Sequence, residues 1–435
     1  MAYLNVTEVE SALVAATAAP YSSFVERIAL PNHTWEGRSC HAIKIGRGQG
    51  PGRAGVFFLG GVHSREWGSS DILVNFIEQL ELAYQNGNGL TFGPHAFSAA
   101  DIASIVDTLD IIVFPQANPD GRNYSMTVDA WWRKNRRTTA PNSSACPGVD
   151  VNRNYDFLWD FPHRFSPSSG IVDSTDPCDA PDPDNGCYHG PAAFSEPETS
   201  NVEWIFDTFA HIGYFMDLHS YGEDLLYSWG DDEDQSTDST MNFLNPAYDG
   251  QRGVSGDAYR EYIPANDLTT SLELAGVFHD AVQAVRGTDY AVKSAYDLYP
   301  TSGTAGDYAY SRHFRDRTKS NVISYTLEWG TEFHPPYSEM QRIIQEITCG
   351  LVAFCLHVRQ LHLGHTAIDR YTAEITAILD FLGRHGGDPI DGDRVRTTLD
   401  FVAIAQTASR YNTGRARQLA DDALRAAWAE VQQLQ

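Results

Sequence analysis

The sequence predicts an α/β protein with a mixed, largely parallel central sheet, helices on both faces and a C-terminal helical extension. Two observations carry this prediction. Short apolar runs of strand length alternate with longer segments of helical periodicity over most of the chain, whereas beyond about residue 366 the periodicity is helical throughout. We therefore expect a large domain over residues 1–362 and a helical extension over residues 363–435.

The first part of the large domain has a β-then-α rhythm. Residues 38–47 alternate like a strand, residues 54–62 form an apolar strand ending in glycines, and residues 70–85 have helical periodicity. Residues 110–114 are another apolar strand, and the Asn-Pro-Asp-Gly run at 118–121 is typical of turns.

The second part begins with a long irregular region. Residues 140–194 predict mostly loop, and the run from Ser195 to Glu198 has the pattern of a capping box that opens a helix to about Phe209. The remaining expected elements are strands over 213–219 and 321–327, a helix from Ser338 to about Gln360, and helices near 366–383, 393–408 and 414–433. The last three would pack on the large domain or mediate self-association.

Composition narrows the class of protein. With 57 acidic and 31 basic residues the net charge is −26, which repels nucleic acid and anionic membranes. No apolar segment is long enough to span a bilayer, and the N-terminus lacks the features of a secretory signal. As written, the chain predicts a cytoplasmic protein, or a secreted one if this is a mature form. The acidic run at 231–234 could hold calcium or lie near the mouth of a pocket, but the pattern favours a solvated loop.

The six cysteines contain no CxxC pair. Cys146, Cys178 and Cys187 lie in the loop-rich region, where one disulfide among them would tie down a long excursion and would indicate a compartment outside the cytoplasm. Cys349 and Cys355 lie in an apolar helical run and are expected to be buried free thiols.

His63 and Glu66 follow the apolar strand at 54–62 and have the spacing of metal ligands. Zinc prefers imidazole and carboxylate ligands, and a catalytic zinc site has three protein ligands and an open position. A third ligand is therefore expected elsewhere in the chain. Taken alone, the His-x-x-Glu pattern fits a polar helix start equally well, so other motifs must decide.

Three more polar motifs lie at or after strand ends, where open α/β sheets place their ligand crevice. They are Trp132-Arg133-Lys134 with Asp150-Val-Asn152-Arg153-Asn154, then Asp217-Leu-His219-Ser-Tyr221, and Thr326-Leu-Glu328-Trp329. With the first motif, they make residues 38–360 resemble the zinc metallocarboxypeptidases of the carboxypeptidase A/B type. The conjunction of HSREW, NPDG, WRKNR, VDVNRNY, LHSY and TLEWG is far more specific than any one of them.

The resemblance implies a reaction and a set of catalytic groups. One zinc ion per chain would be held by His63, Glu66 and His219, would lower the pKa of its bound water toward ~7 and would polarise a carbonyl. Glu328 corresponds to the general base that takes the proton of the water and delivers it to the leaving amine. Arg133 corresponds to the cation that stabilises the developing oxyanion.

The resemblance also implies the residues that bind substrate, the C-terminus of a peptide or protein. Asn152 and Arg153 correspond to the pair that grips the free α-carboxylate, for which a planar guanidinium is well suited. Tyr299 resembles the mobile tyrosine that closes over the C-terminal residue. Tyr221 corresponds to a flanking tyrosine, and Arg65 to an auxiliary substrate-binding arginine.

His189 competes with His219 for the position of the third ligand. His189 lies 189 − 66 = 123 residues after Glu66, nearer to the usual interval of the family than the 219 − 66 = 153 residues to His219. We favour His219 because it follows an apolar strand, whereas His189 ends an irregular loop. Asp150 corresponds to a carboxylate that orients a ligand histidine.

The preferred C-terminal side chain stays open, and two other functions compete. The floor of the specificity pocket corresponds to residues 303–307, where Gly306 is neither a carboxylate nor a bulky apolar group and Asp307 is adjacent. The competing functions are a zinc amidohydrolase acting on γ-glutamyl, peptidoglycan or N-acyl amino acid amides, and a non-catalytic binding protein on the same fold. The presence of Asn152-Arg153 and Tyr299 favours peptide C-termini, and the presence of Glu328 favours catalysis.

Overall fold

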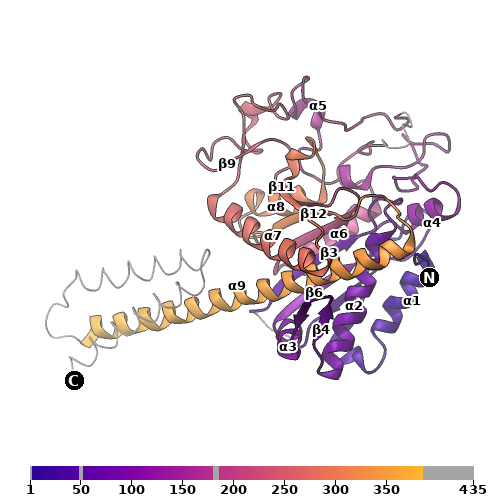
Figure 1. The fold of residues 1–435 in the computed structure, drawn as a ribbon. Coiled ribbons are helices and arrows are strands. Elements are labelled where there is room, and N and C mark those ends of the chain that lie inside the picture. The colour runs from indigo at the N-terminus through magenta and orange to yellow at the C-terminus, as the bar shows by residue number, and fades with distance from the viewer. Residues whose placement is uncertain (1, 49–51, 180–185, 386–435) are drawn as a thin grey trace. The chain divides into compact units, whose positions relative to one another are not determined.

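The computed structural model describes residues 2–48, 52–179 and 186–385, with side chains described up to residue 362 (Figure 1). The chain divides into two units, Met1–Leu356 and His357–Gln435. The predicted helices near 393–408 and 414–433 lie outside the described residues. The predicted domain boundary after residue 362 falls inside helix α9 (Tyr337–His385) and stays a prediction.

The centre of the first unit is a mixed sheet of eight strands among the described residues. Parallel pairing joins β6 to β3, β3 to β7, β7 to β12, and β8 to β11, while β1, β2 and the β12–β8 pair add antiparallel contacts. In sheet order the strands are β1 (Val25–Ala29), β2 (His41–Ile45), β6 (Leu109–Phe114), β3 (Ala54–Gly60), β7 (Ile212–His219), β12 (Ile323–Glu328), β8 (Asp224–Tyr227) and β11 (Ala291–Ser294). Two small sheets pair β4 (Leu90–Phe92) with β5 (His95–Phe97) and β9 (Asp234–Gln235) with β10 (Glu261–Tyr262).

Helices cover both faces of the large sheet, as two neighbouring residues of β3 show. Successive side chains of a strand point to opposite faces. The Phe57 ring contacts Phe206 of α6 (Pro197–Thr208), whereas the Phe58 ring contacts Phe76 of α2 (Gly68–Asn86) and Phe354 of α9. The predicted fold class is therefore confirmed. The other α-helices within the described residues are α1 (Val6–Ala16), α3 (Ala99–Thr108), α4 (Pro119–Thr127), α5 (Phe161–Arg164), α7 (Ala265–Arg286) and α8 (Ala305–Arg315).

Three local predictions were wrong. The Asn-Pro-Asp-Gly run opens helix α4 instead of a turn, because Asn118 caps the helix by accepting from the Gly121 amide and Pro119 fits its first position. Helix α6 is not opened by a capping box, since its N-cap is Glu196, which makes no capping hydrogen bond with its side chain. The helices predicted near 338–360 and 366–383 are one continuous helix, α9.

The acidic run at 231–234 is not a solvated loop. Asp231 and Asp232 are both fully buried. Asp232 accepts a hydrogen bond from the Gly253 amide, and the Asp231 carboxylate lies 3.9 Å from the Arg252 guanidinium, which is also buried. Segments distant in sequence therefore supply the partners that a pattern of four acidic residues does not reveal. Within the described residues, no helix has both the length and the apolar character needed to cross a membrane.

The sheet places three polar residues at one edge. Strands β3, β7 and β12 are parallel neighbours, so their carboxyl ends lie together. His219 ends β7 and pairs in register with Glu328, which ends β12. His63 follows β3 after a glycine turn in which Gly61 adopts φ 66°, a conformation that favours glycine.

Candidate active site

The side chains of His63, Glu66 and His219 converge at this edge of the sheet. Their ligand atoms all lie within 4.8 Å of one another, and all three side chains are buried. The Nδ1 atom of His63 lies 2.8 Å from Glu66 Oε1, and the Nδ1 atom of His219 lies 2.9 Å from Glu66 Oε2. The two Nδ1 atoms are 3.0 Å apart. His219, and not His189, therefore joins the predicted pair.

The outer ring nitrogens of the two histidines face carboxylates. His63 Nε2 lies 3.2 Å from Asp150, and His219 Nε2 lies 2.7 Å from Asp217. A carboxylate at one ring nitrogen holds the proton there and leaves the other nitrogen as a lone-pair donor. With both rings neutral, the two Nδ1 atoms and the Glu66 carboxylate present three lone-pair donors to one another, and a bound cation would satisfy all three. The donor set fits zinc.

Charge dominates the titration of this group. Burial opposes ionisation of His219, but Asp217 and Glu66 raise its pKa well above the usual value. Burial likewise opposes ionisation of Glu66, yet His63 and His219 hold its pKa well below the usual range. The carboxylate of Asp150 also stays charged despite burial, because Arg133 and His63 lower its pKa well below the usual value.

Glu328 and Arg133 border the three ligands. Burial, opposed by His219 and Arg133 and reinforced by the Glu66 carboxylate, raises the pKa of Glu328 to about 8. The Nε–H of Arg133 donates to Asp150 over 2.9 Å, so the carboxylate that contacts His63 also fixes this guanidinium. Both side chains therefore interact electrostatically with the ligand group, and their catalytic roles stay predictions.

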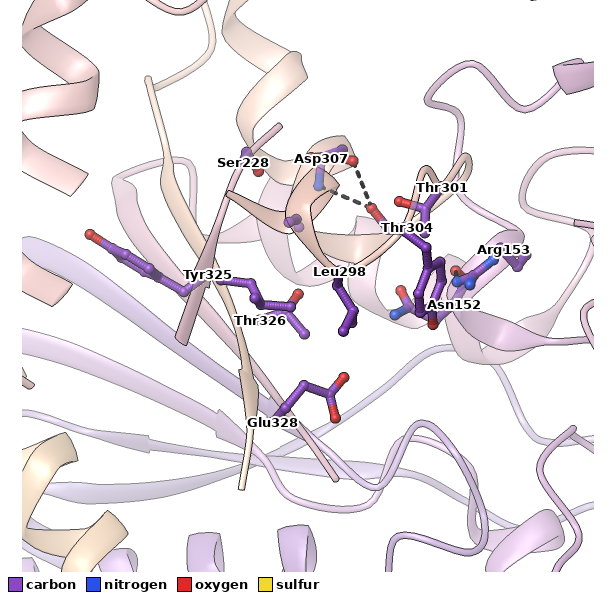
Figure 2. A pocket seen from close by; sticks show the side chains of 14 residues that line it. Asn152, Arg153, Ser228, Leu298, Thr301, Thr304, Asp307, Tyr325, Thr326 and Glu328 are labelled. Atoms are coloured by element: carbon purple, nitrogen blue, oxygen red, sulfur yellow. Dashed lines mark hydrogen bonds between the residues drawn. The ribbon is translucent and has the colours of Figure 1, made fainter. Parts of the chain in front are cut away.

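A pocket lined in part by Glu328 opens beside this group (Figure 2). Asn152 and Arg153, from the 3₁₀ turn at Val151–Arg153, approach the same space from another segment. The remaining lining residues are Leu226, Ser228, Ala295, Leu298, Tyr299, Thr301, Thr304, Gly306, Asp307, Tyr325 and Thr326. The predicted pocket floor and Tyr299 thus line one cavity together with the predicted carboxylate grip.

Hydrogen bonds to neighbouring segments fix the side chains of Asn152 and Arg153. The Asn152 carboxamide accepts from the Ala305 amide at the start of α8, over 2.8 Å. The Nε–H of Arg153 donates to Asp173 over 2.6 Å, and Nη1 donates to the Asn152 carbonyl over 2.7 Å. Nη2 of Arg153 is buried and has no hydrogen-bond partner among the described residues. This nitrogen is the one left to bind an incoming acceptor.

Tyr221 and Arg65 meet on a third aromatic residue. The Tyr221 ring is half exposed and lies 4.8 Å from the Phe333 ring, edge to face. The Arg65 guanidinium lies 4.1 Å from the centre of the same Phe333 ring. Phe333 therefore joins two predicted substrate-binding residues into one surface. Tyr299 is exposed at the pocket, with its ring 6.0 Å from the Arg153 guanidinium.

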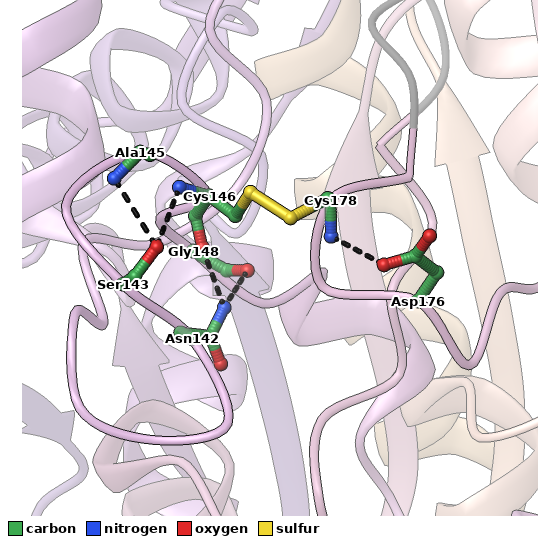
Figure 3. The surroundings of a disulfide bond; sticks show 7 residues. All are labelled: Asn142, Ser143, Ala145, Cys146, Gly148, Asp176 and Cys178. Atoms are coloured by element: carbon green, nitrogen blue, oxygen red, sulfur yellow. Dashed lines mark hydrogen bonds between the residues drawn. A yellow bond between two sulfur atoms is a disulfide. The ribbon is translucent and has the colours of Figure 1, made fainter.

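A disulfide joins Cys146 to Cys178 in the irregular region, and Cys187 is a buried free thiol (Figure 3). A side-chain hydrogen bond fixes the backbone at each of the two cysteines. Ser143 accepts from the Cys146 amide, and Asp176 accepts from the Cys178 amide. Cys349 and Cys355 are buried free thiols, as expected. His189 stacks on Trp159 at 4.2 Å, so its bulk serves packing.

Sequence reasoning assigned no role to three residues of this site. Asp217 had a signal, because residues two apart on a strand point to the same face, as Asp217 and His219 do here. Phe333 and Asp173 had none, since both lie in irregular segments without periodicity.

Comparisons with known proteins show the family to which the chain belongs. The profile of the family described as zinc carboxypeptidase matches residues 11–348, so the chain belongs to the zinc carboxypeptidase family. Carboxypeptidase B of Astacus astacus is 29% identical over 68% of this chain and 77% of its own length. Zinc carboxypeptidase A 1 of Anopheles gambiae is 28% identical over 67% of this chain and 52% of its own length. The chain thus spans about half the length of the Anopheles relative.

The fold has counterparts among solved structures. The crystal structure of the carboxypeptidase A from Helicoverpa armigera superposes with a TM-score of 0.60 over 82% of this chain and 74% of that chain, at 23% identity. At that identity the likeness concerns the fold. It supports the same arrangement of sheet and covering helices described above.

Proposed function

We propose that this protein is a zinc-dependent exopeptidase that hydrolyses the C-terminal peptide bond of peptides and proteins, with one zinc ion per chain. The observation that carries the proposal is the group of His63, Glu66 and His219, which lies beside Glu328 at the edge of the sheet. The adjoining pocket presents the buried Arg153 guanidinium. A cation site next to a fixed positive charge suits a substrate that carries a free carboxylate one residue beyond the scissile bond.

The chain supplies the proton transfers and the charge stabilisation. When bound, zinc supplies Lewis acidity and lowers the pKa of a coordinated water. In its ionised form Glu328 would accept a proton from the attacking water and would deliver it to the leaving amine, as a carboxylate beside the ligands can do. Arg133, fixed by Asp150, stabilises the negative charge that develops on the carbonyl oxygen of the substrate.

Substrate selection is assigned to the pocket residues. Arg153, with the amide group of Asn152 beside it, binds the terminal carboxylate, and an internal peptide segment has no such group to offer. Tyr299 covers the C-terminal side chain from the open side of the pocket. Arg65 and Tyr221, joined by Phe333, contact residues upstream of the scissile bond.

The test is release of free amino acids from a panel of peptides with varied C-terminal residues, each with an amidated twin. Zinc-loaded wild type is compared with Glu328→Gln and with Glu332→Gln, which removes an exposed carboxylate four residues later in the sequence. We expect release from free-carboxylate peptides only, loss of release in Glu328→Gln, and full release in Glu332→Gln. Removal of zinc by a chelator should also abolish release.

Three results would count against the proposal. Equal cleavage of amidated twins would exclude the carboxylate grip and point to another amide substrate. No release from any peptide by wild type would exclude the exopeptidase activity. Unchanged release after chelation and dialysis would exclude the metal-dependent mechanism.

We also propose that the protein works in an oxidising compartment outside the cytoplasm. The support is the Cys146–Cys178 disulfide, since such bonds persist where thiols are not kept reduced. Thiol alkylation of the protein in its native source, without prior reduction, should leave Cys146 and Cys178 unmodified; labelling of both would contradict it.

A further inference from the structure

Asp173 lies behind the proposed carboxylate grip, on a segment far from it in sequence. Its side chain is fully buried, and the Arg153 side chain that it contacts is 2% exposed. Asp173 Oδ1 accepts from Arg153 Nε–H over 2.6 Å. Its other oxygen, Oδ2, accepts from both the amide and the hydroxyl of Ser302. One carboxylate therefore joins the guanidinium to the segment that carries Tyr299, three residues before Ser302.

The segment that bears Asp173 is itself fixed. Ser174, the next residue, pairs with Tyr188 in an isolated β-bridge and donates its amide to the Cys187 carbonyl. The Tyr188 carbonyl in turn accepts from the Asp150 amide, directly before the turn that carries Arg153. Backbone pairing at Ser174 therefore ties the residue next to Asp173 to the segment that leads to Arg153.

The remaining hydrogen bonds of Arg153 show what this contact accomplishes. Nε is taken by Asp173 and Nη1 by the Asn152 carbonyl, whereas Nη2 has no partner among the described residues and Arg153 lines the pocket. A buried guanidinium without a counter-charge is costly and tends to rearrange. With one edge neutralised by Asp173, the guanidinium can keep its place beside the pocket and present its other edge to an incoming carboxylate.

We propose that Asp173 is a positioning residue for the terminal-carboxylate grip: it fixes Arg153 and, through Ser302, couples the grip to the segment that bears Tyr299. This inference rests on the proposed exopeptidase function. No such role was predicted from the sequence. The proposal assigns part of substrate recognition to the irregular segment that lies between Cys146 and Cys178, the two residues of the disulfide.

The test measures binding and turnover separately. In the zinc-loaded Glu328→Gln background, calorimetry gives the dissociation constants of one peptide with a free C-terminal carboxylate and of its amidated twin. The dissociation constant of the amidated twin divided by that of the free-carboxylate peptide reports the grip alone. Asp173→Ala should reduce this ratio by at least about tenfold, which corresponds to about 1.4 kcal/mol, and Asp173→Asn and Ser302→Ala should reduce it by smaller amounts.

Turnover kinetics provide the second reading, and Asp176→Asn is the matched control. Asp176 is an exposed carboxylate on the same segment, so its change removes the same charge without touching Arg153. In the otherwise wild-type enzyme, Asp173→Ala should raise KM for free-carboxylate peptides by at least about tenfold and change kcat by less than about threefold. Asp176→Asn should change neither.

The outcomes separate the two proposals. If wild type hydrolyses no peptide, the exopeptidase function fails, while the binding ratio still tests Asp173. An unchanged ratio in folded Asp173→Ala, an equal fall in Asp176→Asn, or a loss confined to kcat would each overturn the positioning role. If Asp173→Ala does not fold, the ratio of dissociation constants is measured on the near-isosteric variant Asp173→Asn. An unchanged ratio in that variant overturns the positioning role.

Discussion

A carboxylate at position 306 should turn the pocket toward basic C-terminal residues. Gly306 is the second residue of α8 and has an ordinary helical backbone, so a side chain there meets no backbone strain. A Cβ added at Gly306 would lie 3.5 Å from Thr326 Oγ1 and 3.9 Å from Ser228 Oγ, which is ordinary contact distance. An Asp also suits the first turn of a helix. Gly306→Asp should therefore fold and point into the cavity.

The size of the effect follows from the charge pair that the change permits. Two opposite charges about 4 Å apart near a protein surface attract by about 4 kcal/mol, part of which is lost to desolvation. A net gain of about 1.4–2.8 kcal/mol corresponds to a change of about 10- to 100-fold. Asp307 lies next to the new carboxylate, and burial already raises the pKa of Asp307 to about 6. The gain should therefore be larger at pH 8 than at pH 6, where both carboxyls are partly protonated.

The assay is kcat/KM for two peptides that differ only in a C-terminal Lys or Leu. Gly306→Asn is the uncharged control of the same shape, and Gly306→Ala controls for lost volume. We expect the Lys-to-Leu ratio of Gly306→Asp to exceed that of Gly306→Asn by about 10- to 100-fold at pH 8. A ratio within about threefold of Gly306→Asn would refute the placement of position 306 in the pocket that receives the C-terminal side chain.

Other expected results concern the backbone, the disulfide and a buried acid. Gly303→Ala should destabilise the fold by at least about 1 kcal/mol in chemical denaturation and should raise KM. The reason is that Gly303 has φ +57° and that the added Cβ would lie 2.3 Å from the Arg153 carbonyl oxygen. Unchanged stability would contradict this prediction. Replacing Cys146 and Cys178 by Ser should cost about 3–4 kcal/mol in the same assay, since the bond closes a loop with a sequence separation of 32; a loss under about 1 kcal/mol contradicts it. Burial and a neighbouring carboxylate raise the pKa of Glu198 to about 8, above the unfolded value of about 4.3, so the unfolded state binds fewer protons and stability falls as pH rises between these values. Glu198→Gln should remove this fall in the free energy of unfolding, which amounts to up to about 1.4 kcal/mol per pH unit. If wild type and variant gave parallel curves of unfolding free energy from pH 5 to 8, the prediction would be contradicted.

The predicted metal ligands His63, Glu66 and His219 could be found from the sequence because strands of the sheet position them. Apolar runs identify β3, β7 and β12, and the parallel sheet then brings their carboxyl ends together with no further information. His219 was preferred to His189 on this ground alone, against the spacing. The structure places His219 with His63 and Glu66, and it stacks His189 on Trp159. Strand placement therefore carried more information than sequence interval, which insertions in loops change freely.

Local patterns failed where tertiary partners decide. Asn-Pro-Asp-Gly is compatible with a turn and with a helix start, and the structure selects the helix, in which the Asp120 carboxylate also accepts from Thr34 and Arg38. The acidic run at 231–234 looks solvated until Arg252 and the Gly253 amide are brought to it. In both cases the partner is remote in sequence or lies in a segment without periodicity, so no reading of the run itself could reveal it.

Strand ends and the irregular region contribute different parts of the site. Strand ends supply His219 and Glu328, whose positions are fixed by the register of the sheet. The irregular region supplies Asp150 and Asp173, the carboxylates that hold Arg133 and Arg153. A change in that region can therefore alter how a substrate carboxylate is bound while the metal ligands on the sheet stay in place. Asp150 is the exception, because it contacts both a ligand histidine and the Arg133 guanidinium. Changes at Asp150 should therefore affect metal affinity and turnover together, whereas changes at Asp173 should affect substrate binding alone.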